Sequence, residues 1–534
     1  MRKTSILYIL AGALAMVSCE DFLDETPDNR TELDSEEKIT SLLVSAYPTH
    51  MPHFVAELMS DNVMDNGSQY SPYLPSLDDQ AYLYETVENE GSNDSPSSVW
   101  ESCYMAIASA NQAIEAIEAM GSPESLNPQR AEALMCRAYG HFVLVNFFCQ
   151  AYCFADTAMG IPYITAPETK PVVHYDRGTV AEVYAKINAD IEEALPMLDD
   201  NHLTVPKYHF NVAAGYAFAA RFNLYYLKFD KVIEYATKVL GANPSAKMRD
   251  YYSWKAAIAG GATEIGNIFP SATDVNNLMV LPTYSLWGRG YSYSRRYGHG
   301  RDKCLYETFW ASNLWGSGSR STTLVYSSSL YGNNQNVRFP KCGEFFEYTD
   351  RAAGVGFAHV VMVPFRTEET LLCRAEAYAL KGEYDLATAD INTWIKSHCA
   401  PTQPAVTRAQ INSFYSALDY TTPEAPTIKP QLHPVGFEVE AGEQENFVDC
   451  VLHCRRLELI HEGMRLQDIK RYGIVVVHNV DGGEPLVLGT DSPRRAAQLP
   501  AAVINSGIEP NPTGNATSTP DLESAGNNSL VAAE

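Results

Sequence analysis

The stretch 449–473, DCVLHCRRLELIHEGMRLQDIKRYG, places the strongest constraint on how this chain can fold. Its apolar residues, among them Val451 and Leu457, recur at helical spacing, and charged residues of both signs stand between them. The pattern predicts an amphipathic helix with one buried face and a solvated flank of ion pairs. The residues expected to pair with one another across a turn of this helix are Glu458, Glu462, Arg455 and Arg465.

Helical patterns recur along the rest of the chain. Apolar residues in 128–150 follow helical steps, and Thr179 with Glu182 has the spacing of a capping box that begins another helix. The segments 211–240 and 366–396 each carry apolar residues at steps of three, four and three. Such helix–turn–helix pairs predict stacked tetratricopeptide-like repeats, with unrelated amphipathic helices as the alternative.

Two regions interrupt the helical pattern. The first, 65–98, is rich in glycine, proline, serine and asparagine, and its tyrosines follow neither helical nor strand spacing. We therefore expect a loop, and loops on rigid scaffolds often carry binding residues. The candidate ligand-binding residues in this loop are Tyr70, Tyr73 and Tyr84.

The second region, 243–364, is longer than a simple loop, and its middle gathers three of the six tryptophans among glycines and tyrosines. Flat aromatic faces can stack on sugar rings, and nearby donors such as Arg289 and Arg295 can bind the hydroxyl groups. The alternative is that the tryptophans fill a small core beneath the insertion. The candidate ligand-binding residues here are Trp287, Tyr291, Tyr293, Trp310 and Trp315.

The first residues have the pattern of an export signal. Arg2 and Lys3 precede the apolar run 6–17, which is too short to span a bilayer, and the small residue Ser18 stands directly before Cys19. This arrangement resembles the signal of a bacterial lipoprotein, in which Cys19 becomes the lipidated first residue, for example by a palmitate chain. An ordinary secretory signal is the alternative.

Composition excludes several functions. The chain has 39 lysine and arginine residues and 65 aspartate and glutamate residues, which gives a net charge of −26. This acidic balance argues against a nucleic-acid partner. No CxxC pair occurs, and no recognised sequence motif for nucleophilic, metal-dependent or nucleotide chemistry is found. We therefore predict no enzyme activity, no metal and no cofactor, and we assign no disulfide.

The stretch described first resembles a known family. The residues that match the RRxEL, EGxR and DxKRxG motifs of the SusD/RagB family are Arg455, Arg456, Glu458, Leu459, Glu462, Gly463, Arg465, Asp468, Lys470, Arg471 and Gly473. Further matches follow the pattern of the family in RTEETLLCRAEAYALKG at 366–382 and in the closing residues 491–512. The resemblance runs from Cys19 to about Pro512.

This resemblance implies a mainly α-helical fold, a tetratricopeptide-like superhelix with long irregular insertions. It also implies a lipid-anchored protein at the surface of the outer membrane, which captures a glycan for a SusC-like TonB-dependent transporter. Capture of peptides in the RagB manner is the alternative, and a repeat scaffold that binds only protein is a third. The family's motif residues are expected to be structural rather than ligand contacts.

The expected organisation of the chain follows from these patterns. The predicted parts are a signal peptide at 1–18, a lipidated tether at 19–33, a helical domain at 34–510 with insertions at about 65–98 and 243–364, and a disordered polar tail at 511–534.

Overall fold

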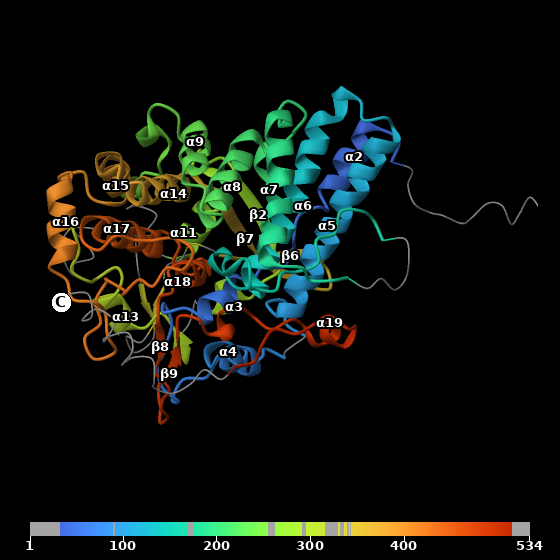
Figure 1. Ribbon diagram of the computed structural model, residues 1–534. Coiled ribbons are helices and arrows are strands. Elements are labelled where there is room, and N and C mark those ends of the chain that lie inside the picture. Colours follow the sequence, from blue (N-terminus) through green and yellow to red (C-terminus); the bar gives the residue numbers. More distant parts are fainter. Residues whose placement is uncertain are drawn as a thin grey trace, which may run out of the picture.

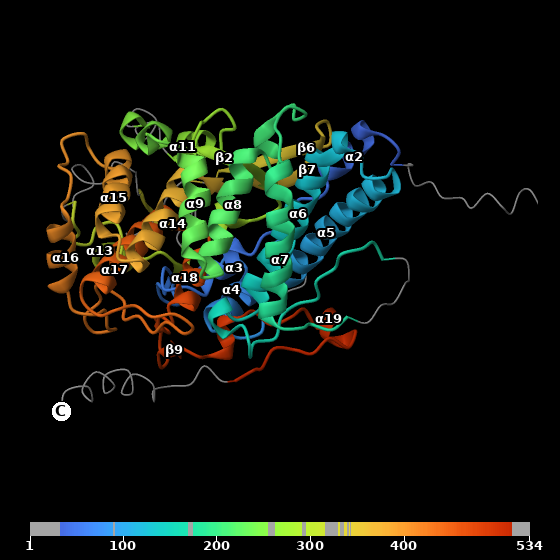
Figure 2. The ribbon, with the colours of Figure 1, turned by 45° about the horizontal axis from the view of Figure 1, so that its top comes forward.

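The computed structural model describes residues 33–88, 91–168, 175–254, 262–290, 295–315, 329–331, 336–338, 341 and 343–514. Long helices stand side by side in a row that runs across the molecule from α2 to α16 (Figures 1 and 2). This mainly helical architecture confirms the predicted fold class. The helices of the row are α2 (Glu36–Leu43), α5 (Pro96–Ala119), α6 (Asn127–Phe148), α7 (Val180–Ala194), α8 (Val212–Tyr225), α9 (Phe229–Leu240), α14 (Thr367–Leu380), α15 (Tyr384–His398), α16 (Arg408–Ser416) and α17 (Glu443–Glu458).

Local sequence determines where these helices begin and turn. The capping box predicted at Thr179 and Glu182 is present at the start of α7, with the Thr179 side chain accepting from Glu182 N and the Glu182 carboxylate accepting from Thr179 N. Gly382, at a φ of 74°, makes the turn between α14 and α15. The predicted capping box is therefore confirmed.

Two helix pairs of the row carry the same buried ion pair. Arg137 on α6 donates to both carboxylate oxygens of Asp190 on α7, each at 2.7 Å. Arg374 on α14 binds both oxygens of Asp390 on α15 in the same way, at 2.8 and 2.7 Å. Bidentate pairs of this kind fix the distance and rotation between two helices. The same contact thus recurs in two helix pairs, as expected of stacked repeats.

The opposite side of the molecule joins the beginning of the chain to its end. The Tyr82 ring at the end of α4 stacks on His478 of β8, with ring centroids 4.1 Å apart. Since α4 lies inside 65–98, the prediction that this region is only a loop is wrong: proline at the first helical position allows a short helix there. The elements of this side are α3 (His53–Leu58), β1 (Met64–Asp65), α4 (Pro75–Tyr82), β3 (Tyr297–Gly298), α13 (Arg301–Tyr306), α18 (Arg465–Arg471), β8 (Val476–His478), β9 (Leu486–Leu488) and α19 (Ala501–Asn505).

The insertion 243–364 contains a small antiparallel sheet of three strands in the order β2-β7-β6. Its longest strand, β7 (Val355–Arg366), leads directly into α14 and pairs with β2 (Asn277–Thr283) on one side and β6 (Glu344–Asp350) on the other. The other short elements here are α11 (Ala262–Ile268), α12 (Trp287–Gly290), β4 (Ser329–Tyr331) and β5 (Asn336–Arg338).

The stretch 449–473 does not form the single amphipathic helix that was predicted. Helix α17 ends at Glu458, the chain turns through His461 and Gly463 at positive φ, and α18 begins at Arg465. Almost all the charged motif residues are buried, so no solvated flank exists. A Cβ on Gly463 would lie 2.7 Å from the carbonyl oxygen of His53, which explains why this turn needs glycine.

The charged residues of this stretch pair with other elements rather than across a turn of one helix, which corrects the prediction. Glu458 and Glu462 both bind Arg366, at 2.8 and 2.7 Å. Arg465 pairs instead with Asp61, at 2.7 Å, and Arg455 with Asp468, at 3.2 Å. The motif therefore ties α17 and α18 to the end of β7 and to the segment after α3. As expected from the resemblance, these residues act in the structure of the core.

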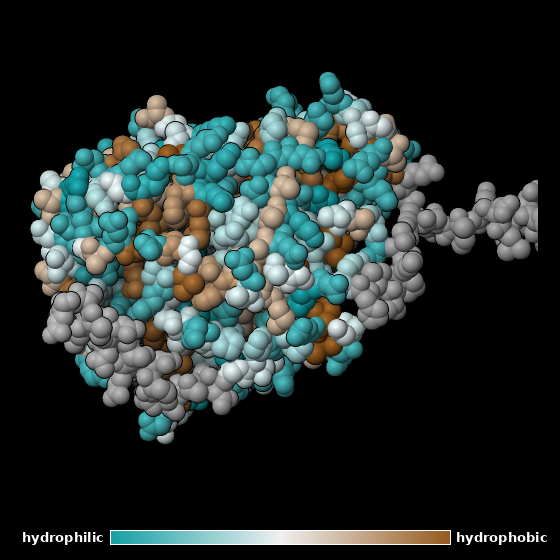
Figure 3. All heavy atoms as spheres, in the orientation of Figure 1, coloured by the Kyte–Doolittle hydropathy of each residue, from teal (hydrophilic) through white to brown (hydrophobic). Residues whose placement is uncertain are grey.

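The surface in Figure 3 is mostly hydrophilic, with hydrophobic residues in separate patches. Over the residues that the structure describes, no helix has the length and apolar character needed to cross a membrane. The nine cysteines in this part of the chain are free, and no group of His, Cys, Asp and Glu side chains within it has the arrangement of a metal site.

Candidate binding surface

Two of the predicted ligand-binding tryptophans lie in the interior. Trp287 and Trp315 are only 2% and 1% exposed, so they do not form an exposed platform. The Trp315 ring stacks on His453 with centroids 5.5 Å apart and also packs against Trp394. The alternative considered for the insertion, that tryptophans fill a core beneath it, describes these two residues correctly. Burial of a large aromatic ring stabilises the fold and explains why they stand there.

The other predicted residues differ in their surroundings. Tyr84 is buried, and its hydroxyl lies 3.1 Å from Met59 O and 3.2 Å from His478 Nε2, so it also belongs to the core. Tyr70, Tyr73 and Trp310 are half-buried and keep part of their rings at the surface. Tyr291 and Tyr293 lie outside the described residues. Ligand contact by the half-buried rings stays a prediction.

Tyr73 is the predicted residue that lies within a group of arginines. The guanidinium of Arg295 lies over the Tyr73 ring, 4.7 Å from its centroid. Arg289 donates to both carboxylate oxygens of Glu344, each at 2.5 Å, and these bonds, followed by a hydrogen bond to Tyr73, raise the pKa of Arg289. The guanidinium is thus held in one orientation while its side chain stays 44% exposed.

A second group of rings lies on the segment between β2 and α12 and on β7. Tyr284 packs against His50 with centroids 5.5 Å apart and against Phe357 of β7 at 5.9 Å. Phe357 is 54% exposed and Tyr284 is half-buried, so both rings offer apolar area to solvent. We call these two groups together, Tyr73 with Arg289 and Arg295, and Tyr284 with Phe357, the aromatic–arginine surface.

Two buried carboxylates hold the loops that carry this surface. Asp78 accepts from Tyr73 N at 2.6 Å and Leu74 N at 3.1 Å, and Asp94 accepts from Ser285 Oγ at 2.5 Å and Leu286 N at 2.9 Å. Burial raises the pKa of each carboxyl to about 6, although these hydrogen bonds oppose the shift. The loops are therefore fixed in position before a ligand arrives.

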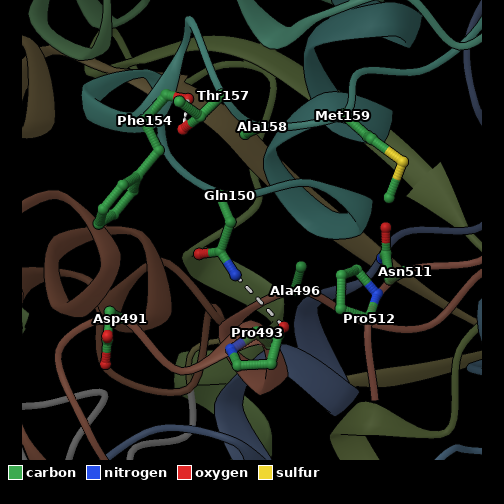
Figure 4. Close-up of a pocket in the computed structure, with 10 residues that line it drawn as sticks. All are labelled: Gln150, Phe154, Thr157, Ala158, Met159, Asp491, Pro493, Ala496, Asn511 and Pro512. Carbon is green, nitrogen blue, oxygen red and sulfur yellow. Dashed lines mark hydrogen bonds between the residues drawn. The ribbon is translucent and has the colours of Figure 1, made fainter. Parts of the chain in front are cut away.

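A separate hollow of about 200 Å³ lies between the end of α6 and the closing segment of the chain (Figure 4). Two of its polar residues are already engaged: Gln150 donates to Pro493 O, and the buried Asn511 amide donates to Phe148 O and Ala497 O. A hollow of this size holds far less than a drug-sized ligand needs. We therefore place the candidate site on the open aromatic–arginine surface.

Two residues of this surface, Tyr284 and Phe357, are not among the candidates predicted from sequence. Phe357 lies on a β-hairpin whose strands, 344–350 and 355–366, are joined by the short turn RAAG. Strand-like runs of β-branched and aromatic residues separated by a few residues with glycine predict such a hairpin. That pattern is the signal that could have indicated Phe357.

Comparisons with known proteins agree with these features. A family described as "Starch-binding associating with outer membrane" matches residues 21–224, and the SusD family matches residues 285–524. No curated protein matches the chain in sequence at a significant level.

Several solved structures share the fold. A SusD superfamily protein from Bacteroides fragilis has a TM-score of 0.60 at 18% identity, covering 89% of this chain and 99% of its own. A SusD-like carbohydrate binding protein from Bacteroides vulgatus ATCC 8482 has a TM-score of 0.54 at 18% identity, covering 93% and 97%. A SusD superfamily protein from Bacteroides thetaiotaomicron VPI-5482 has a TM-score of 0.59 at 18% identity, covering 89% and 98%.

Proposed function

This chain belongs to the SusD/RagB family, and we propose that it is a surface lipoprotein of the outer membrane that binds a glycan without catalysing a reaction. It would pass this glycan to a SusC-like TonB-dependent transporter, which we propose as its partner. The family membership supports the outer-membrane association, and the carbohydrate-binding protein among its structural relatives supports a sugar ligand.

The observation that carries this proposal is the aromatic–arginine surface. Its rings offer flat apolar area of the kind that stacks on the faces of sugar rings. Its two arginines offer donors directed by Glu344 and by the Tyr73 ring, which suits the hydroxyl groups at the edges of a sugar. An open surface also allows a polymer to bind several rings at once, so that weak single contacts add up.

Peptide capture is the second candidate function, and the same arginines favour it. Guanidinium groups bind carboxylates in a bidentate manner, so Arg289 and Arg295 would suit an acidic side chain or the carboxyl end of a peptide. A glycan with carboxylate groups would satisfy the same chemistry. Binding measurements with neutral glycans, acidic glycans and peptides distinguish these ligands.

We expect Tyr284→Ala to weaken glycan binding about two- to tenfold, because a stacked ring contributes roughly 0.5–1.5 kcal/mol. Tyr73→Ala should have a similar effect, and the double variant should bind a short oligosaccharide hardly at all. Affinity electrophoresis and calorimetry with a panel of glycans and peptides measure these changes. The matched control is Tyr420→Ala, which removes a ring that is 39% exposed beside α17 and outside this surface.

The glycan proposal fails if the parent protein binds peptides and none of the glycans. It also fails if Tyr284→Ala and Tyr420→Ala reduce glycan affinity equally, because the loss would then not depend on this surface. Thermal unfolding of each variant shows whether the fold is intact, which separates loss of binding from loss of structure.

We propose Cys19 as the site of the lipid anchor. Since a single cysteine would carry all the acyl chains, Cys19→Ala should move nearly all of the protein from the outer-membrane fraction to the soluble fraction. Membrane fractionation with labelled palmitate measures both location and lipid content. A variant that stays in the membrane and still incorporates label would contradict this assignment.

A further inference from the structure

The β6–β7 hairpin leaves one edge of the small sheet open. In the order β2-β7-β6, β6 is the outer strand, and the described residues place no strand against its other side. All of its residues except the half-buried Phe345 are exposed. Figure 2 shows β6 and β7 at the upper edge of the molecule, between the labels of β2 and α2. An outer strand directs alternate N–H and C=O groups away from the sheet, where another strand can bind them.

Both faces of this hairpin carry exposed aromatic rings. Phe346 and Tyr348 lie on one face, 45% and 51% exposed, with ring centroids 4.8 Å apart. Phe357 stands opposite Glu347 in the register and lies on the other face. Residues 355–359 of β7 pair only with β6, because the pairing with β2 reaches no further than Val360. This end of the hairpin is a two-stranded ribbon, which alone is only marginally stable in water. A third strand would cover these rings and stabilise the ribbon.

The charge of β6 indicates what kind of strand fits. Glu344, Glu347 and Asp350 are acidic, and Glu344 alone of the three has an ion-pair partner within the described residues, namely Arg289. Asp350 accepts from Ala352 N and Ala353 N and thereby forms the turn. Cross-strand neighbours of opposite charge stabilise a sheet, and like charges destabilise it.

A second copy of this chain is a poor partner for the open edge of β6, because like charges would then face each other. Antiparallel pairing of two β6 strands about a twofold axis at Glu347 would place Glu347 opposite its own copy. The same register would place Glu344 opposite Asp350, so every acidic residue would face another.

We propose that the open edge of β6 binds an extended segment of a partner protein in which basic residues alternate with apolar ones. The backbone of β6 would supply the affinity, Glu347 on one face of the strand would select lysine or arginine, and the rings of Phe346 and Tyr348 on the other face would pack on the apolar side chains. This site uses the outer edge of the hairpin and does not depend on the glycan proposal.

The test uses the intact mature protein and a blocked peptide of alternating lysine and valine long enough to span β6. The control peptide has the same charge but carries prolines in place of the central valines, so it cannot add to a sheet. We expect the first peptide to bind at least about tenfold more tightly than the control. Hydrogen exchange should then slow at the amides of 344–350 when the first peptide is present.

Glu347→Lys should weaken binding of the lysine peptide about tenfold, because a basic residue would face the basic strand. The matched control is Glu424→Lys, the same charge change at an exposed position on the loop after α16. Equal binding of the two peptides, unchanged exchange at 344–350 or equal effects of the two variants would overturn the proposal. A dimer of the free protein that Glu347→Lys abolishes would also overturn it, in favour of a second copy.

Discussion

Replacing Glu458 with alanine is expected to lower the free energy of unfolding by about 3–5 kcal/mol, because the change leaves buried partners without their counter-charge. Glu458 binds Arg366 at 2.8 Å and His398 at 2.8 Å, and it accepts from Trp394 Nε1 at 2.9 Å. Burial alone would raise the pKa of Glu458, but Arg366 and then His398 hold it well below its ordinary value. The carboxylate is thus ionised in the core, and the Arg366 guanidinium depends on it.

Denaturant unfolding of the purified variants measures this effect. Glu458→Gln keeps an acceptor for Trp394 Nε1 and removes only the charge, so it separates the ionic part of the loss from the loss of packing. Glu462→Ala should lower the free energy of unfolding less. Arg366 would still be paired with Glu458 in that variant, and the Glu462 side chain is 12% exposed. The surface control is Glu443→Ala, which breaks a pair with Arg408 whose side chains are 31% and 43% exposed and should cost under about 1 kcal/mol.

A loss at Glu458 no larger than that at Glu443 would contradict the view that the buried network holds the core. If Glu458→Ala instead kept its stability but lost ligand binding, the family motif would have a function in recognition. A ligand would then have to reach the motif residues, and Glu458 is only 2% exposed in this structure.

The helices could be predicted from sequence because their signals are local. The capping box at Thr179 needs only Glu182 three residues later, and the turn before α15 needs only Gly382. The partners of Glu458 could not be predicted in this way. Arg366 stands 92 residues earlier in the chain, and the packing of the sheet, α14 and α17 brings it to Glu458. Periodicity places a charged residue on a helix, and it does not say which distant charge will meet it.

The same limit explains the outcome for the aromatic residues. A tryptophan among glycines can stand at a surface or fill a core, and sequence spacing is the same in both cases. Trp315 becomes buried because His453 and Trp394, both on distant helices, enclose it. Tyr73 stays near the surface because Asp78 fixes its loop and Arg295 covers one face of its ring. The candidate surface thus depends on contacts between segments that are far apart in sequence.

Asp449 leads to the second large effect, and here the substitution is expected to stabilise the protein. Its side chain is 0% exposed, and neither carboxylate oxygen has a hydrogen-bond partner among the residues that the structure describes. Burial raises the pKa of Asp449 well above its ordinary value, Glu445 adds to the shift, and Lys429 and Arg465 only partly oppose it. An uncharged carboxyl therefore fits this site better than a carboxylate. Asparagine has the same shape and is uncharged at every pH.

The sign of the pH dependence follows from this shift. In the unfolded chain Asp449 has an ordinary pKa of about 3.9, and in the folded protein its pKa is higher. The favourable contribution of the protonated carboxyl is fully present below pH of about 4 and is lost as the pH rises through the folded pKa. Asp449→Asn avoids that loss, so we expect it to raise the free energy of unfolding clearly at pH 7 and by almost nothing near pH 4.

Unfolding curves of Asp449→Asn and the parent protein across this pH range test the prediction. The difference between them should grow by up to about 1.4 kcal/mol per pH unit, since one proton separates the two states. Asp419→Asn, at an exposed position, is the matched control and should change the free energy of unfolding by less than about 0.5 kcal/mol at any pH. A gain at Asp449 that is the same at pH 4 and pH 7 would mean that packing, rather than the charge of a buried carboxylate, limits stability at this site.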